Sequence, residues 1–212
     1  MNRDKLLTEI HASGRPAELL VIQETGGTKS TIEAGVAAIA RIKAEADKAP
    51  RVPMDLSELI VGTICGGSDG TSGISANPAV GRCFDALVEA NAICIFEETG
   101  ELIGCETIMA DRAVTPELGV EIEACVAKAE NYYRIMGFGS FAPGNADGGL
   151  TTMEEKSMGA YSKSGSSPIS GLIKPGDIPP AGGLYLLDVV PDGEPRFGFP
   201  NISDNAEIIE LI

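Results

Sequence analysis

Apolar residues recur at helical spacing in five stretches of the chain. In the first stretch Leu6, Leu7 and Ile10 share one face, and Ser13-Gly14-Arg15-Pro16 ends the helix with a turn and a proline. Capping residues or prolines open the other four, with Thr28 and Asn77 as the expected N-caps of the first two. These four stretches predict helices over residues 28 to about 47, 77 to about 90, 116 to about 137 and 153 to about 163.

Shorter apolar runs between the helices have the length of buried strands. They are Leu19 to Gln23, Leu59 to Ile64, Ala92 to Phe96 and Gly182 to Val190. Strands that alternate with helices predict an α/β fold with a largely parallel sheet and helices on both faces, a Rossmann-like layered architecture. We expect one α/β catalytic-type domain over residues 1–212, with 138–150 as the place where it could subdivide.

The composition suits a globular protein and narrows the classes of partner. Of the 212 residues, 43% are hydrophobic, which is enough for a substantial core. The 16 lysines and arginines stand against 31 aspartates and glutamates, so the formal net charge is -15. This charge excludes a broad positive face for nucleic acid or an anionic membrane, although a small anionic substrate could still bind locally.

The sequence also narrows the compartment and the available chemistry. It has no apolar stretch of bilayer-spanning length, and Met1 to Gly14 lacks the apolar centre of a secretory signal, so we expect a cytoplasmic protein. The five cysteines follow neither CxxC nor zinc-type spacing, which predicts reduced thiols. The single histidine, His11, is expected on the surface of the first helix, so a histidine triad or multi-histidine metal site within this chain is not expected.

Polar segments follow three of the predicted strands, where ligands bind in open parallel sheets. These segments are Gln23 to Gly27, Cys65 to Asp69 and Glu97 to Glu101. The first continues into "GGTKST", which lacks the first glycine of a phosphate-binding P-loop, so a nucleotide site is not expected. Backbone N–H groups close to a ligand oxygen and a plain strand-to-helix turn remain equal alternatives there.

The loop from Cys65 to Asn77 combines glycines with hydroxyl and carboxylate groups. Such a loop suits a sugar-acid pocket, and the N-terminus of the following helix would stabilise a substrate carboxylate. Glycine, serine and aspartate are also ordinary turn residues, and alone the loop favours that interpretation. Cys65 could be a metal ligand or a small turn residue; a nucleophilic or redox role is disfavoured without a histidine partner or a second spaced cysteine.

Two later segments carry clustered charge. "FEETGELIGCE" places Glu97, Glu98, Glu101 and Glu106 behind a strand, where they could hold a divalent metal, act as a general base, or form solvated surface. "APGNADGGLTTMEEKSMG" leads from paired glycines to a capped helix with Glu154, Glu155 and Lys156. A lysine or carboxylate there could abstract a proton, while favourable first-turn acids and a solvated lysine are the ordinary alternative.

The order of these motifs resembles a known enzyme family. "VIQETGGT", "CGGSDGTSGISANPAVG", "EETGELIGCE" and "APGNADGGLTTMEEKSMGAYSKSGSSPISGLIKPGD" are similar to segments of the altronate dehydratase and galactarate dehydratase family, which includes the large subunit of sulfolactate sulfo-lyase. The resemblance runs from about Leu19 to Asp188. It implies β-elimination of water from a sugar acid such as altronate or galactarate to give a 2-keto-3-deoxy acid, with Fe²⁺ or Mn²⁺ as cofactor.

The resemblance also implies partners for the chain. Family members are usually longer, so the chain is expected to be the first catalytic half of a larger enzyme, a homo-oligomer whose further sequence follows residue 212. The family's small antifreeze-like domain, expected in front or on a separate subunit, is a further expected partner. Two other functions stay open: release of sulfite from sulfolactate, and a non-catalytic scaffold that pairs with a catalytic subunit.

Motif by motif, the resemblance implies a set of site residues. Lys156 is expected as base or enediolate stabiliser, and Asp69 and Glu98 as catalytic groups that transfer protons or bind the metal. Cys65 joins Asp69 and Glu98 as an expected metal ligand. The expected substrate-binding residues are Gly66, Gly67, Ser68, Asn77, Asn145, Gly148, Gly149, Thr151 and Thr152.

Overall fold

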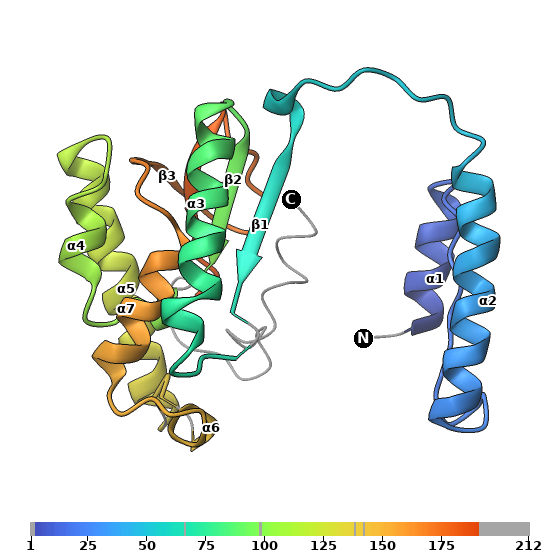
Figure 1. Cartoon of the computed structure of the whole chain (residues 1–212), viewed down its shortest axis with the longest axis horizontal. Coiled ribbons are helices and arrows are strands. Elements are labelled where there is room, and N and C mark those ends of the chain that lie inside the picture. Colours follow the sequence, from blue (N-terminus) through green and yellow to red (C-terminus); the bar gives the residue numbers. More distant parts are fainter. Residues whose placement is uncertain (1–2, 66, 98, 138, 142, 191–212) are drawn as a thin grey trace. The chain divides into compact units, whose positions relative to one another are not determined.

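The computed structural model describes residues 3–65, 67–97, 99–137, 139–141 and 143–190. By its contacts the chain divides into two compact units, Met1–Pro53 and Met54–Ile212, which are taken one at a time below (Figure 1). The division falls where the helical pattern breaks before Pro53, and none falls at 138–150. One catalytic-type domain over 1–212 stays a prediction, because contact density alone does not decide which parts of a chain fold alone.

The first unit contains two helices, α1 (Arg3–Ala12) and α2 (Thr28–Ala46), both of which were expected. The strand predicted at Leu19 to Gln23 is wrong, because the segment ends in turns. The Val21 carbonyl accepts hydrogen bonds from the N–H groups of Glu24 and Thr25, each at 2.9 Å, and the Ile22 carbonyl accepts one from Gly27. A strand needs a neighbour for its backbone groups, and none of the described residues of this unit forms one.

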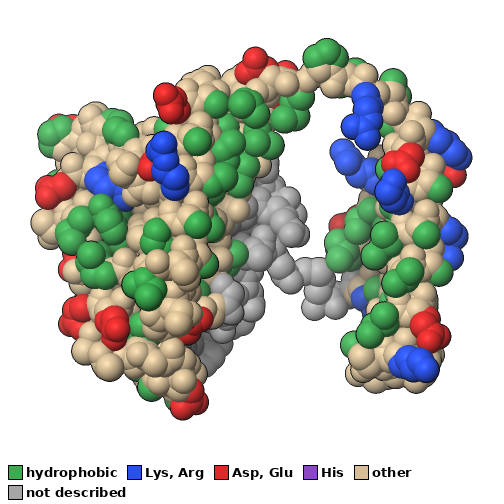
Figure 2. All heavy atoms as spheres, viewed as in Figure 1, with side chains coloured by type: hydrophobic (Ala, Val, Ile, Leu, Met, Phe, Trp, Pro, Cys, Tyr) green, Lys and Arg blue, Asp and Glu red, His purple; other side chains and the backbone are tan. Residues whose placement is uncertain are grey.

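The start of α2 also differs from the sequence expectation, and its outer face carries exposed apolar side chains. Its N-cap is Gly27, at a positive φ of 101° that favours glycine, while Thr28 is the first helical residue and the predicted Thr28 cap is wrong. Small residues face inward: Ala38 is buried, and a Cβ on Gly35 would meet Leu20 at 3.6 Å. Ile32, Val36 and Ile39 are instead 61 to 66% exposed, and Figure 2 shows hydrophobic side chains on the surface of this unit.

The second unit contains the sheet and most of the helices. Its described elements are η1 (Leu56–Glu58), β1 (Ile60–Ile64), η2 (Ser72–Ile74), α3 (Ala76–Glu89), β2 (Ile93–Glu97), η3 (Thr99–Glu101), α4 (Glu106–Ala110), α5 (Pro116–Met136), α6 (Pro143–Asp147), α7 (Met153–Lys163), β3 (Ile169–Ile173) and β4 (Gly183–Leu187). The four strands lie in the order β1-β2-β4-β3, and every pairing is parallel. The predicted α/β fold is therefore confirmed.

Three predicted strands and three predicted helices of this unit form as expected, whereas β3, α4 and α6 were not predicted. The β3 segment "ISGLI" has a glycine at its centre and a register shift between Ile169 and Gly171, which hide the pattern of a regular strand. The short helices α4 and α6 have only five residues each, too few for a helical period to be recognised in the sequence.

Two clusters of buried side chains form the core. Cys94 and Phe96 of β2 and Leu186 of β4 belong to the first cluster, with Phe84 of α3 and Ile122 of α5. Residues that alternate with them along the same strands, Ile95, Tyr185 and Leu187, belong to the second cluster with Ala129 and Tyr132 of α5. Because alternate side chains point to opposite faces of a sheet, both faces are packed. Burial of each large apolar side chain contributes about 1.5–3 kcal/mol.

Three expectations about single residues and segments can be checked directly. The described helices include none long and apolar enough to cross a membrane. The five cysteines, all within the described ranges, form no disulfide, as predicted. His11 lies on the exposed surface of α1, as predicted, with its Nε2 atom 2.9 Å from the Ala17 carbonyl oxygen.

Candidate functional site

The site begins where β1 and β2 end. The two strands pair in register, with Ile64 opposite Glu97, so the loops that follow them start side by side at the carboxyl edge of the sheet. The prediction that the Cys65 and Glu97 segments follow strands is thus confirmed. The third expected segment, Gln23 to Gly27, follows no strand and belongs to the other unit.

Asp69 organises the first glycine loop. Its Oδ1 atom accepts hydrogen bonds from the Thr71 hydroxyl at 2.6 Å and from the N–H groups of Thr71 and Ser72 at 2.7 and 2.9 Å. The Thr71 hydroxyl, followed by these two N–H groups, lowers the pKa of Asp69. Asp69 is therefore a carboxylate at neutral pH and holds the turn that leads into η2.

The two glycine loops are in direct contact. The Gly70 N–H donates to the Gly148 carbonyl at 2.8 Å, and the Asn145 Nδ2 group donates to the Ser68 carbonyl at 3.1 Å. A Cβ on Gly148 would lie 2.9 Å from the Asp69 Cβ, so glycine is required there by close approach. Two segments almost 80 residues apart in the sequence therefore form one wall of the candidate site.

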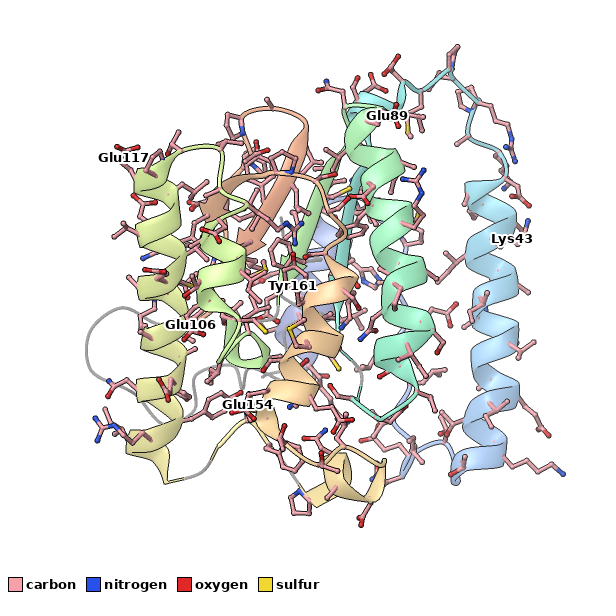
Figure 3. The ribbon with its side chains drawn as sticks, turned by 60° about the vertical axis from the view of Figure 1, so that its left-hand side comes forward. Lys43, Glu89, Glu106, Glu117, Glu154 and Tyr161 are labelled. Carbon is pink, nitrogen blue, oxygen red and sulfur yellow. The ribbon has the colours of Figure 1, made fainter. Side chains whose placement is uncertain are left out.

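Helix α7 supplies a second wall. Thr152 is its N-cap and accepts from the Glu155 N–H at 3.1 Å, as predicted. The N–H of Thr151 and then its hydroxyl, both donating to Glu155 Oε2 at 2.7 Å, lower the pKa of Glu155. In Figure 3, Glu154 marks the first turn of this helix and Tyr161 a later one.

Asn77 links α3 to α7. The predicted Asn77 cap is wrong, because Ser75 precedes the helix and makes no side-chain cap bond. The Asn77 Nδ2 group donates instead to the Gly159 carbonyl on α7 at 3.0 Å. A tertiary acceptor thus takes the side chain that sequence rules would assign to the helix terminus.

These elements enclose a cavity of about 250 Å³. Among the residues that line it are four predicted site residues: Ser68, Asp69, Asn77 and Lys156. The lining also includes residues that were not predicted as site residues, namely Glu155, Met158 and Ile74, the last of which is 81% exposed. The motifs therefore converge on one polar cavity with an apolar side.

Among the described residues that line the cavity, Lys156 is the one with a cationic side chain. The side chain is almost fully buried, and Nζ lies 3.2 Å from Glu101 Oε1 and donates a hydrogen bond to the Ser140 carbonyl. Glu101 comes from η3, directly after β2, while Glu97 at the end of β2 is 1% exposed. Burial first, then Glu101 and Glu97, raises the pKa of Tyr133 on α5, so that its phenol stays protonated.

The other predicted site residues have supporting or undetermined places. Thr151 and Thr152 hold the start of α7, and Gly149 lies beside Gly70 and Gly148. The described lining of the cavity includes none of Gly67, Gly149, Thr151 and Thr152. The Cys65 Sγ atom lies 3.1 Å from the Ser68 hydroxyl. Gly66 and Glu98 lie outside the described residues.

The expected metal ligands do not form a complete set in the part of the chain that the structure describes. No three His, Cys, Asp or Glu side chains there come together as a metal site. All three hydrogen bonds given above for Asp69 use Oδ1, and the Cys65 thiol contacts a hydroxyl. The described residues alone therefore do not fit the expected ion, and the Cys65, Asp69 and Glu98 set stays a prediction.

Sequence reasoning missed the partner of Lys156. Glu101 was one of four clustered glutamates, and nothing local separates it from Glu106, which is half-buried like Glu101 itself. The available signal was its position four residues beyond the end of a buried strand, at the edge where ligands bind. Sequence reasoning also missed Met158 as a residue of the cavity lining, because the one signal available was its position two residues after Lys156 in a predicted helix.

A parallel α/β sheet with a polar cavity beyond its strand ends defines an α/β protein that can bind a small ligand. A family model described as "D-galactarate/Altronate dehydratase, C-terminal" matches residues 56–197. The chain belongs to this family.

Curated relatives carry names from the same family. Altronate dehydratase of Bacillus subtilis is 36% identical over 77% of this chain and 34% of its own length. The (2R)-sulfolactate sulfo-lyase subunit beta of Chromohalobacter salexigens is 34% identical over 87% of this chain and 49% of its own. Galactarate dehydratase (L-threo-forming) of Escherichia coli is 40% identical over 60% of this chain and 25% of its own. The chain spans between a quarter and a half of the length of these relatives.

Proposed function

We propose that this chain carries the substrate pocket of a hydro-lyase that removes water from a sugar acid such as altronate or galactarate. One observation carries the proposal: two glycine loops and α7, which contain the motifs, meet around a single cavity with Lys156 in its wall. The relatives named as dehydratases support the same reaction type.

The proposed reaction has two requirements. A base removes the proton beside the carboxylate, and the electron pair moves onto that carboxylate to form an enediolate. The β-hydroxyl then leaves with a proton as water, and the enol becomes a 2-keto-3-deoxy acid. Stabilisation of the negative charge in the enediolate is the larger demand on the site, because the proton next to a carboxylate is weakly acidic.

The described residues can meet these requirements in part. Lys156 brings a positive charge to a cavity that otherwise holds the carboxylates of Asp69 and Glu155. Asn77 and Ser68 offer polar groups for substrate hydroxyls. Asp69 is our candidate for proton transfer, although its hydrogen bonds make it a weaker base, so the reaction depends the more on enediolate stabilisation. Glu98 is the second candidate.

Dependence on Fe²⁺ or Mn²⁺ is part of the proposal and rests on the family resemblance. When bound, such an ion would supply a Lewis acid for the carboxylate and hydroxyl oxygens of the substrate. Metal content of the purified protein, measured for the wild type, Cys65→Ser and Asp69→Ala, tests the ligands. Unchanged content in both variants would remove these two residues from the ligand set.

A sulfo-acid substrate is the second candidate. The sulfo-lyase subunit matches 87% of this chain, more than the other two relatives described above. Elimination from sulfolactate would follow the same steps with sulfite as the leaving group and pyruvate as the product. The Asp69 and Glu155 carboxylates near the cavity disfavour a second anionic group on the substrate. The monocarboxylate altronate is therefore our first choice, ahead of sulfolactate and of galactarate, which has two carboxylates.

The experiment incubates the protein with galactarate, altronate or sulfolactate in the presence of Fe²⁺ or Mn²⁺, alone and with a small antifreeze-like subunit. We expect a 2-keto acid from one of the sugar acids, detected by NMR, and loss of that product in Lys156→Met. Glu123→Gln, an exposed change on α5, is the matched control. No keto acid, pyruvate or sulfite under any combination would refute the lyase assignment.

A further inference from the structure

Lys156 and Glu101 form an ion pair beneath the cavity. Lys156 is 5% exposed and the Glu101 side chain 17% exposed, with 3.2 Å between Nζ and Oε1. They come from α7 and η3, 55 residues apart in the sequence. A buried charge is costly unless it is paired and hydrogen-bonded, so removal of either partner leaves the other in an unfavourable environment.

The geometry limits what the Lys156 amine can do. An ammonium group has three N–H donors and no acceptor. One donates to the Ser140 carbonyl and another faces the Glu101 carboxylate, which leaves the third for a ligand in the cavity that Lys156 lines. The Ser140 carbonyl and the Glu101 carboxylate are both hydrogen-bond acceptors, so both favour an ammonium group that donates to them. A general base would need a lone pair on this nitrogen, which neither partner supports.

The charges around the Lys156–Glu101 pair also favour a cationic role for Lys156. Glu97 ends β2 and Glu101 lies in η3 just after it, while the described lining of the cavity holds the carboxylates of Asp69 and Glu155. The Tyr133 phenol on α5 adds a neutral group, and the described lining of the cavity has Lys156 as its one cation. An anion formed in the cavity beside the Asp69 and Glu155 carboxylates needs this charge in a fixed position.

We propose that Glu101 is a positioning residue that fixes Lys156 as a cationic hydrogen-bond donor to the anion formed on the substrate, so that Lys156 is not the base. The inference rests on the proposed function. In this scheme the α-proton passes to another group, the electron pair moves onto the substrate carboxylate, and a Lys156 N–H stabilises the resulting enediolate. The β-hydroxyl leaves as water after protonation, and Lys156 keeps its three protons throughout.

The first measurement needs no substrate. In protein labelled with ¹⁵N-lysine, we expect a slowly exchanging ¹H–¹⁵Nζ cross-peak for Lys156, assigned by its absence in Lys156→Arg. It should persist in the exposed control Glu123→Gln and disappear through faster exchange in Glu101→Gln, while Glu101→Asp should keep part of it. An unchanged cross-peak in Glu101→Gln would overturn the positioning role. Near-UV circular dichroism establishes that each variant is folded.

The second measurement is kinetic. Removal of an oxyanion donor lowers kcat by about 10²–10³-fold, so Lys156→Met and Glu101→Gln should lose kcat to this extent with a smaller change in KM. Lys156→Arg should keep part of the activity, because arginine donates hydrogen bonds but is effectively always protonated. Full kcat in Glu101→Gln, or a Lys156→Arg kcat no higher than that of Lys156→Met, would overturn the donor role.

The two measurements separate this inference from the proposed function. A wild-type protein without activity toward galactarate, altronate and sulfolactate would refute the lyase assignment and, with it, the donor role. The ammonium cross-peak would still decide whether Glu101 positions Lys156.

Discussion

Gly81 lies at a close contact between α3 and the end of α7, and its replacement by alanine gives a sharp test of the packing. A Cβ there would lie 2.1 Å from the Ser162 carbonyl oxygen and 2.8 Å from the Gly165 nitrogen. Ordinary van der Waals contact begins near 3.4 Å, so the backbones would have to separate by about 1.3 Å. No side-chain rotation can relieve the clash, because the atoms that Cβ meets belong to the backbone.

The expected cost follows from overpacking. An added methyl group in a packed core costs about 1–3 kcal/mol, and a rigid backbone contact places Gly81→Ala at the upper end, about 3 kcal/mol. For a unit of this size each kcal/mol lowers Tm by about 2–4 °C, so we expect a loss of about 6–12 °C. Gly144→Ala is the control, because nothing lies within 4 Å of its added Cβ, and its stability should change by less than about 0.5 kcal/mol.

The assay can report on this unit alone. The chain has no tryptophan, and its four tyrosines, at positions 132, 133, 161 and 185, all belong to the Met54–Ile212 unit. Thermal unfolding followed by near-UV circular dichroism therefore records the sheet-containing unit. A Gly81→Ala variant within about 2 °C of the wild type would refute the close α3–α7 contact.

Three further predictions concern an ionised group, a helix cap and the glycine loops. Asp85 accepts hydrogen bonds from the N–H and hydroxyl groups of Ser166 and Ser167; burial raises its pKa, but these bonds together lower it more. Its contribution is thus present above the unfolded value near 3.9 and lost as pH falls through the lower folded value. Asp85→Asn should cost about 1–2 kcal/mol in urea unfolding at pH 7, and an equal difference at pH 2.5 would contradict this. Thr152→Ala removes the N-cap of α7 and should cost about 1 kcal/mol by the same assay; no loss would disprove the cap. Asn145→Ala removes the bond to the Ser68 carbonyl and should lower kcat/KM about tenfold or more on the substrate found, whereas an unchanged kcat/KM would separate the loop contact from activity.

The local sequence predicted elements that have a strong period or a clear cap. The α5 helix begins with Thr115 and Pro116 and ends at Gly137 in the left-handed conformation, and Thr152 caps α7 as expected. Both signals are local, because capping and glycine's access to positive φ depend on neighbouring residues. The predicted strand at Leu19 to Gln23 was wrong for the opposite reason: an apolar run becomes a strand only beside another strand.

The candidate site shows the same division between local sequence signals and tertiary contacts. The motifs in the sequence determined the family and the segments that contain Asp69, Asn145 and Lys156, because these signals are contiguous stretches. Tertiary structure decided which side chains meet: Glu101 rather than its neighbouring glutamates pairs with Lys156, and Asn77 donates to α7 instead of capping α3. These contacts depend on strand register and on the approach of α3 to α7 through glycines. Such long-range geometry is set by the packing of the whole unit, and no short stretch of sequence contains it.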